Sequence, residues 1–228
     1  MPENLLFIPG LLCDETVWLP VRELLGQGCI ADLGDRDSIR GMATDLLAAH
    51  PGPLAVAGHS MGARVALEMH RQAPARIRRL ALLDTGTHPA RPGEEVNRFR
   101  RVRLGYEKGM AALCQDWLPP MLAEANQNRT EITKPLTEMV LRQTPERHEN
   151  QIKALLNRPD ARKALAEITC PTLIGVGDED QWSPPAQHRE IAAKIPGSTL
   201  VIIENTGHFA PFEAPTETAR AMRNWLNT

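Results

Sequence analysis

The 228-residue sequence has no apolar run that approaches the roughly 20 residues needed to cross a bilayer. Its start, residues 1–10, is briefly apolar, but no basic segment precedes the apolar stretch and Pro9-Gly10 ends it. A secretory signal peptide needs both features, so we predict none here. We therefore expect a cytoplasmic protein that does not engage a membrane.

Neither sign of charge dominates, and cysteine is sparse. The formal net charge is −2, which gives no reason to expect a nucleic-acid partner. The four cysteines, Cys13, Cys29, Cys114 and Cys170, are scattered and form no Cys-x-x-Cys pair. Such a distribution is typical of free thiols in a reducing compartment and argues against a disulfide framework.

Internal repeats and low-complexity tracts are also missing. The remaining composition, 42% hydrophobic and 24% charged, is ordinary for a globular protein. A chain of this length can form one domain with a sizeable core, or a core with a cap.

Short apolar runs alternate with helical patterns along most of the chain. Because these runs are apolar throughout, rather than alternating with polar residues, they predict a mostly parallel sheet with helices on both faces. The predicted strands are 4–8, 29–33, 54–57, 77–83, 171–176 and 198–203. The predicted helices of this α/β core are 16–25, 39–50, 61–72, 184–194 and 216–226.

Residues 88–167 interrupt this alternation. The segment shows helical periodicity, many charges and repeated prolines, with no convincing strand. It is too long for a plain loop, so we predict a helical cap of roughly four helices inserted at this point. The core would then consist of residues 1–87 and 168–228.

A Gly-His-Ser-Met-Gly sequence at residues 58–62 joins a predicted strand to a predicted helix. A serine hydroxyl can attack a carbonyl group only if it is exposed on a sharp turn, and such a turn needs small residues two positions before and after the serine. The pattern therefore indicates Ser60 as a nucleophile. The plainer alternative is a tight turn with an incidental serine.

A nucleophilic serine needs a base, and the base needs a carboxylate partner. His208 follows the last predicted strand, where the ends of parallel strands place functional side chains. Three acids follow predicted strands in the same way: Asp84, Asp178 and Asp180. The residues alone leave the choice among these acids open.

Together these pieces resemble the α/β-hydrolase family, most closely its compact esterase, enol-lactonase and pimeloyl-ester-hydrolase branch. The matching motifs are residues 9–11 (Pro-Gly-Leu), 58–62, 177–180 (Gly-Asp-Glu-Asp) with 184–185 (Pro-Pro), and 207–209 (Gly-His-Phe). The resemblance covers nearly the whole chain. Two departures are the missing antiparallel hairpin that usually opens the fold, and Pro9-Gly10 in place of the His-Gly of many members.

The resemblance implies a catalytic triad of Ser60, His208 and Asp180, the last residue of Gly-x-x-Asp. Asp178 would then be a loop or cap residue, and Asp84 remains a further candidate for the acid because some relatives place it there.

The resemblance also implies an oxyanion hole built from the backbone N–H groups of Leu11 and Met61. We interpret His59, next to the nucleophile, as a packed orienting residue, with a direct catalytic role as the alternative.

Substrate-binding residues are harder to predict. Leu12, Trp117 and Trp182 are candidates for apolar pocket walls, as are Trp18 and Met121, although core packing is the plainer interpretation of each. The basic segment 97–103 lies in the predicted cap. It is either a solvated helix face, or a face from which Arg98 or Arg101 turns inward to meet a substrate carboxylate.

We therefore predict a serine hydrolase of carboxylic esters or lactones that works through an acyl-enzyme, without metal or cofactor, on a small-molecule substrate. The alternatives are a lyase or carbon–carbon bond hydrolase with the same triad, which inward arginines would favour, and a ligand-binding protein on a hydrolase scaffold. Specificity in this fold depends on the cap and loops, so the natural substrate and the oligomeric state stay open.

Overall fold

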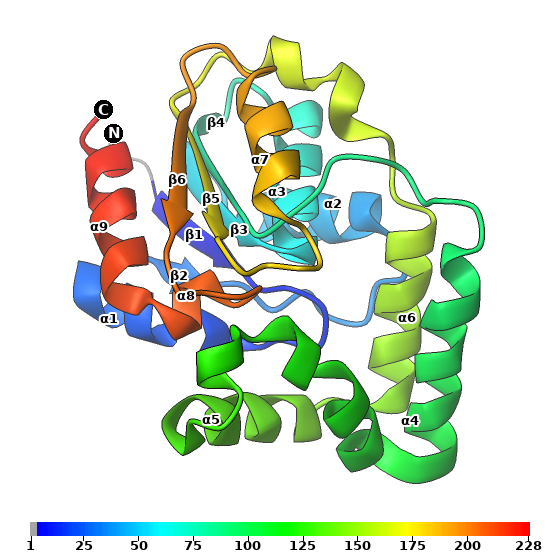
Figure 1. Ribbon diagram of the computed structural model, residues 1–228. Coiled ribbons are helices and arrows are strands. Elements are labelled where there is room, and N and C mark those ends of the chain that lie inside the picture. The colour runs from blue at the N-terminus through cyan, green and yellow to red at the C-terminus, as the bar shows by residue number, and fades with distance from the viewer. Residues whose placement is uncertain (1–3) are drawn as a thin grey trace.

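Six parallel strands form a single sheet in the computed structural model, which describes residues 4–228 (Figure 1). Residues 1–3, which belong to the predicted core segment 1–87 and to the run considered as a signal peptide, lie outside the described residues. The strand order is β2-β1-β3-β4-β5-β6, and every described pairing is parallel. The strands are β1 (Asn4–Ile8), β2 (Cys29–Ile30), β3 (Leu54–His59), β4 (Ile77–Leu83), β5 (Thr172–Gly177) and β6 (Thr199–Ile203).

Helices cover both faces of this sheet (Figure 1). On one face lie α1 (Leu19–Leu25), α8 (Ala210–Glu213) and α9 (Pro215–Leu226), and on the other α2 (Ile39–Ala49), α3 (Met61–Gln72) and α7 (Pro185–Ala192). Since each inner strand is sandwiched, every residue of β3 and of β5 is buried. This burial on both sides explains why the strands read as unbroken apolar runs in the sequence.

The predicted fold class is confirmed. Some boundaries differ. The predicted strand 29–33 is shorter in the structure: only Cys29 and Ile30 pair with β1. The predicted helix 16–25 is divided into a 3₁₀ turn, Glu15–Val17, and α1, and the short helix α8 was not predicted.

Residues 88–167 contain three α-helices and no strand. These are α4 (Glu94–Trp117), α5 (Thr130–Leu141) and α6 (Pro145–Leu156), where roughly four helices were predicted. Short 3₁₀ turns connect α4 to α5, and α4 kinks at Gly109, where φ is 81°. Both α5 and α6 pack against α4, and the three helices lie beyond the carboxyl ends of the strands (Figure 1). The division into a core and a separate cap stays a prediction.

All four cysteines are free thiols, as predicted. Among the helices of residues 4–228, none combines the length and apolar content that a bilayer crossing requires.

Candidate active site

Ser60 sits on a strained turn between β3 and α3, with φ 55° and ψ −115°. The two flanking glycines make this turn possible. A Cβ on Gly62 would lie 2.2 Å from the carbonyl oxygen of Ile8, and one on Gly58 would lie 2.4 Å from the backbone of Ala63. Such contacts are forbidden, so only glycine fits at both positions, and the backbone of β1 can approach the start of α3 closely. The turn leaves the Ser60 side chain partly exposed.

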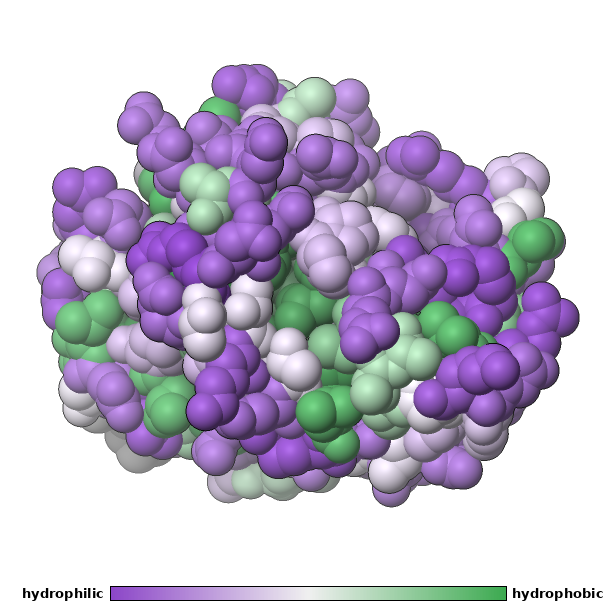
Figure 2. Space-filling model, turned by 60° about the horizontal axis from the view of Figure 1, so that its bottom comes forward, coloured by the Kyte–Doolittle hydropathy of each residue, from purple (hydrophilic) through white to green (hydrophobic). Residues whose placement is uncertain are grey.

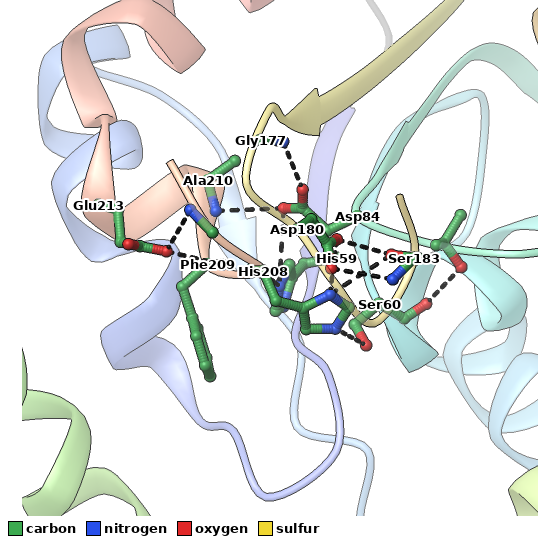
Figure 3. A network of polar contacts seen from close by, with 12 residues as sticks. His59, Ser60, Asp84, Gly177, Asp180, Ser183, His208, Phe209, Ala210 and Glu213 are labelled. Atoms are coloured by element: carbon green, nitrogen blue, oxygen red, sulfur yellow. Dashed lines mark hydrogen bonds and ion pairs between the residues drawn. The ribbon is translucent and has the colours of Figure 1, made fainter. Parts of the chain in front are cut away.

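The His208 imidazole lies between Ser60 and Asp180 (Figure 3). Its Nε2 atom is 2.8 Å from Ser60 Oγ, and its Nδ1 atom is 2.8 Å from Asp180 Oδ2. His208 and Asp180 are both buried, whereas the serine is accessible. The three side chains expected from the sequence to act together therefore form one hydrogen-bonded chain.

Asp180 also accepts hydrogen bonds from residues other than His208. Its Oδ1 accepts hydrogen bonds from the backbone N–H groups of Trp182 and Ser183, and its Oδ2 accepts one from Ser183 Oγ at 2.7 Å. Burial would raise the pKa of this carboxyl, but the charge and hydrogen bonds of His208 and the bonds from Ser183 outweigh it and lower the pKa. The carboxylate is therefore ionised and oriented toward the ring.

The two competing acids lie elsewhere. Asp178 is exposed and accepts a hydrogen bond from the N–H of Thr206. Asp84 is fully buried and accepts from the N–H groups of Gly177 and Ala210, which ties the end of β5 to α8. Burial and the nearby charge of Asp180 raise the pKa of Asp84 well above its usual range. Within the described residues, neither of these acids makes a hydrogen bond to the His208 ring.

His59 supports the loop that carries His208. Its buried ring donates from Nε2 to the carbonyl oxygen of His208 at 2.7 Å, which leaves Nδ1 as the unprotonated nitrogen. Burial, reinforced by the charge of His208, lowers the pKa of His59 to about 3, so the ring is neutral. This geometry fits the predicted orienting role.

The predicted oxyanion-hole residues are Leu11 and Met61. Met61 is the first residue of α3, where the N–H has no partner within the helix, and Leu11 belongs to the turn after β1. Both residues line the cavity beside Ser60. The next N–H along the turn, that of Leu12, is already bonded to Gln151 Oε1.

Glu213 joins the His208 loop to the helical segment. Its Oε1 accepts from the N–H groups of Gly207 and Phe209, and its Oε2 accepts from the N–H of Ala123 and from Asn126 Nδ2. Figure 3 shows this carboxylate beside the loop, away from Ser60. One side chain therefore braces the residues on both sides of His208.

A cavity of about 480 Å³ opens onto Ser60 and His208. Of the predicted substrate-binding residues, Trp117, Trp182, Arg98 and Arg101 line it, as does Met121. Leu12 does not: it is fully buried among core residues, and so is Trp18, whose indole N–H donates to Ile8 O. These two side chains belong to the core because they lie under the turn after β1. Figure 2, turned toward α4 and α5, shows hydrophobic residues in a hollow of this face between hydrophilic surroundings.

Several residues of the site were not singled out from the sequence. They are Arg64, His148, Arg158, Ser183 and Glu213. For Arg64 a signal existed, because a residue four positions after Ser60 on a helix lies one turn along the same side. The others had no such signal. No cluster of three or more histidine, cysteine or acidic side chains suited to a metal ion occurs among residues 4–228.

The geometry agrees with a comparison to known protein families. The model of the alpha/beta hydrolase family matches residues 5–221. The chain belongs to the alpha/beta hydrolase family. This hydrolase resembles an esterase from Thermogutta terrifontis, with 29% sequence identity and a TM-score of 0.92 over 99% of this chain and 89% of that one.

The chain spans only part of the length of its curated relatives. The 2-hydroxy-6-oxononadienedioate/2-hydroxy-6-oxononatrienedioate hydrolase 2 of Pseudomonas putida is 30% identical over 69% of this chain, which spans 57% of that protein. The pimeloyl-[acyl-carrier protein] methyl ester esterase of Neisseria meningitidis is 26% identical over 79% of this chain and 71% of that protein. The esterase-like resemblance read from the motifs is thus confirmed at the level of the family.

Proposed function

We propose that this hydrolase cleaves carboxylic esters or lactones through an acyl-enzyme on Ser60. The observation that carries the proposal is the continuous hydrogen-bonded chain from Ser60 Oγ through His208 to Asp180. A serine hydroxyl is a poor nucleophile until a base removes its proton, and His208 Nε2 is at the right distance to do so.

In the first half-reaction, Ser60 Oγ attacks the ester carbonyl carbon as its proton passes to His208. The N–H groups of Leu11 and Met61 stabilise the resulting oxyanion, and each such donor is worth about 10²–10³ in rate. The bond to the alkoxy oxygen then breaks, and His208 returns the proton to the leaving alcohol. Asp180 keeps the ring in the required tautomer and stabilises its charge.

The second half-reaction repeats these steps with water. His208 removes a proton from water, the hydroxide attacks the acyl carbon, and the bond to Ser60 Oγ breaks with return of the proton. The products are a carboxylic acid and a free enzyme. We further propose that residues 88–167 act as the cap that closes the cavity over this site, since Met121 and Trp117 contribute to its walls.

Substitution of Ser60 tests the proposal. Ser60→Ala should lower kcat on a p-nitrophenyl ester by about 10⁴-fold or more, because triad residues act as a unit. It should also abolish labelling by a fluorophosphonate probe. Ser198→Ala, which removes a serine outside the cavity, is the matched control. Near-normal hydrolysis by Ser60→Ala would refute the proposal, and failure of the unmodified enzyme to react with the probe would favour a ligand-binding protein.

Carbon–carbon bond hydrolysis is a second candidate. It is supported by the similarity to the Pseudomonas putida hydrolase and by Arg98 and Arg101, the two predicted arginines, which line the cavity. Turnover of a 2-hydroxy-6-oxodienoate with a higher kcat/KM than any ester of similar size would favour it over ester hydrolysis.

A further inference from the structure

Five arginines line the cavity that holds Ser60, and three of them, from separate parts of the chain, lie close enough for their charges to act on one another. Arg64 comes from α3, Arg98 from α4, and Arg158 from the segment after α6. The side chains of Arg98 and Arg158 are only 13% and 2% exposed. Charges withdrawn from water to this degree need compensation by a partner of opposite sign.

Compensation within the protein is incomplete. Glu94 alone pairs with two of the three arginines, at 2.7 Å from Arg98 and 2.7 Å from Arg158. Arg64 forms no ion pair among the described residues, and its one hydrogen bond goes to the carbonyl oxygen of His88. Within this group of three arginines and Glu94, three positive charges face one negative charge, and the unpaired arginine of the three is the one nearest to Ser60 in the chain.

The excess of positive charge affects the pKa of Arg64. Burial, together with the charges of Arg158 and Arg98, lowers the pKa of its guanidinium well below the usual value. A guanidinium nevertheless keeps its proton at neutral pH, so the side chain remains a cation. An anion bound beside it would relieve the repulsion between the three arginines.

Two further polar groups on the cavity wall lack partners. His148, on α6, is fully buried, and neither ring nitrogen has a hydrogen-bond partner within residues 4–228. The indole N–H of the buried Trp117 is likewise unpaired in this part of the chain. Each buried polar group without a partner costs about 1–3 kcal/mol. Both groups lie behind the cavity surface, so they add polarity to this wall without contacting solvent.

We infer that this part of the cavity binds a carboxylate carried by the substrate, so that the enzyme prefers half-esters of short dicarboxylic acids. The inference rests on the proposed ester hydrolysis and names its substrate class. The free edge of one guanidinium matches the two oxygens of a carboxylate. Arg64 lies one helical turn after Ser60, so the anionic end and the ester carbonyl would be separated by only a few bonds.

A pair of substrates of matched size tests the preference. Monophenyl glutarate carries the carboxylate, and phenyl pentanoate is its neutral counterpart. We expect kcat/KM of the unmodified enzyme to favour the glutarate ester by about 10-fold or more, the range that a charge-assisted hydrogen bond provides. Equal values for the two esters, or a preference for the neutral one, would overturn the inference while leaving ester hydrolysis intact.

Substitution of Arg64 identifies the residue responsible. In Arg64→Met the ratio of the two kcat/KM values should fall about 10-fold or more, and Arg64→Lys, which keeps the charge but not the planar fork, should give an intermediate ratio. Arg103→Met removes an equal charge from an exposed position on α4 and should leave the ratio unchanged. An unchanged ratio in a folded Arg64→Met enzyme would contradict the role of Arg64.

Binding without turnover separates this inference from the proposed function. In the Ser60→Ala background, calorimetry should detect the binding of glutarate. Adding Arg64→Met should weaken that binding about 10-fold or more, and adding Arg64→Lys should weaken it to a smaller extent. This outcome supports the carboxylate site even if no ester is hydrolysed. Binding of inorganic phosphate but not glutarate, or of pentanoate as tightly as glutarate, would refute it.

Discussion

The Nε2 atom of His208 lies 2.8 Å from the Oγ atom of Ser60, although 148 residues separate them in the chain. Ser60 follows β3 and His208 follows β6, and β4 and β5 lie between these strands in the sheet. The loop after β6 must therefore reach across the carboxyl end of the sheet. His59 accounts for part of this placement, because it donates a hydrogen bond to the carbonyl oxygen of His208 itself.

The identity of the acid can be tested by two single-atom substitutions. Asp180→Asn should lower kcat by about 10³–10⁴-fold, because an amide cannot hold the His208 tautomer or stabilise its charge. Asp178→Asn, on the same loop but directed away from the ring, should stay within a few-fold of the unmodified enzyme. Steady-state kinetics on one p-nitrophenyl ester compares the two, and the reverse order would move the acid to Asp178.

Glu213 should matter for the position of His208 although it does not touch the reacting atoms. Glu213→Gln places an amide against backbone N–H donors, so we expect kcat to fall by roughly 10-fold and the free energy of unfolding by about 1–3 kcal/mol. Kinetics and urea denaturation measure both. Glu217→Gln, an exposed neighbour on α9, is the control. A loss of stability with kcat unchanged would leave Glu213 as a purely structural residue.

Two glycine substitutions, one at the turn of Ser60 and one in α4, should have opposite effects on stability. Gly62→Ala would force a Cβ to within 2.2 Å of the carbonyl oxygen of Ile8, so it should destabilise the protein by several kcal/mol or prevent folding. Gly105→Ala, in α4, meets nothing closer than 3.6 Å and should stabilise the protein by about 0.5–1 kcal/mol through helix propensity. Thermal unfolding distinguishes the two, and a stable Gly62→Ala protein would show that the backbone can open there.

Glu94 should make the stability of the enzyme depend on acid pH. Burial opposes its ionisation, but hydrogen bonds from Arg158, the Arg91 backbone and Arg98 lower its pKa from 4.5 to about 2. A carboxyl with a lowered folded-state pKa stabilises the protein fully above its unfolded pKa, and that contribution is lost as the pH falls toward the folded value.

The difference in unfolding free energy between the unmodified protein and Glu94→Gln should therefore shrink as the pH is lowered below about 4.5. Urea denaturation at several values between pH 6 and pH 3 measures this difference. Glu95→Gln, which changes an exposed neighbour, should show no such trend. A difference that grows in acid would contradict the lowered pKa of Glu94.

Local patterns in the sequence predicted much of the fold. The apolar strands and the glycines around Ser60 could be recognised because their requirements are met by neighbours in the chain: a buried strand needs apolar residues, and a sharp turn needs small ones. The ends of elements were less predictable. The second strand pairs with β1 only at Cys29 and Ile30, and this pairing is a contact between distant segments.

Side chains that depend on distant segments were the hardest to predict. Leu12 was a candidate for the pocket but belongs to the core, whereas Arg64 and Arg158 line the cavity and were not considered. Their positions depend on how α3, α4 and α6 pack, and no short pattern in the sequence encodes that packing.

The sequence by itself determined the parallel α/β core, the helical interruption at residues 88–167, and the candidates Ser60 and His208, since each follows from residues close together in the chain. Only the tertiary structure placed Asp180, rather than Asp84 or Asp178, against the His208 ring, and only it brought three arginines to one cavity wall. The physical reason is the same in both cases. Hydrogen bonds and charge interactions depend on the distance between side chains in the folded protein, and the spacing of residues in the sequence does not give that distance.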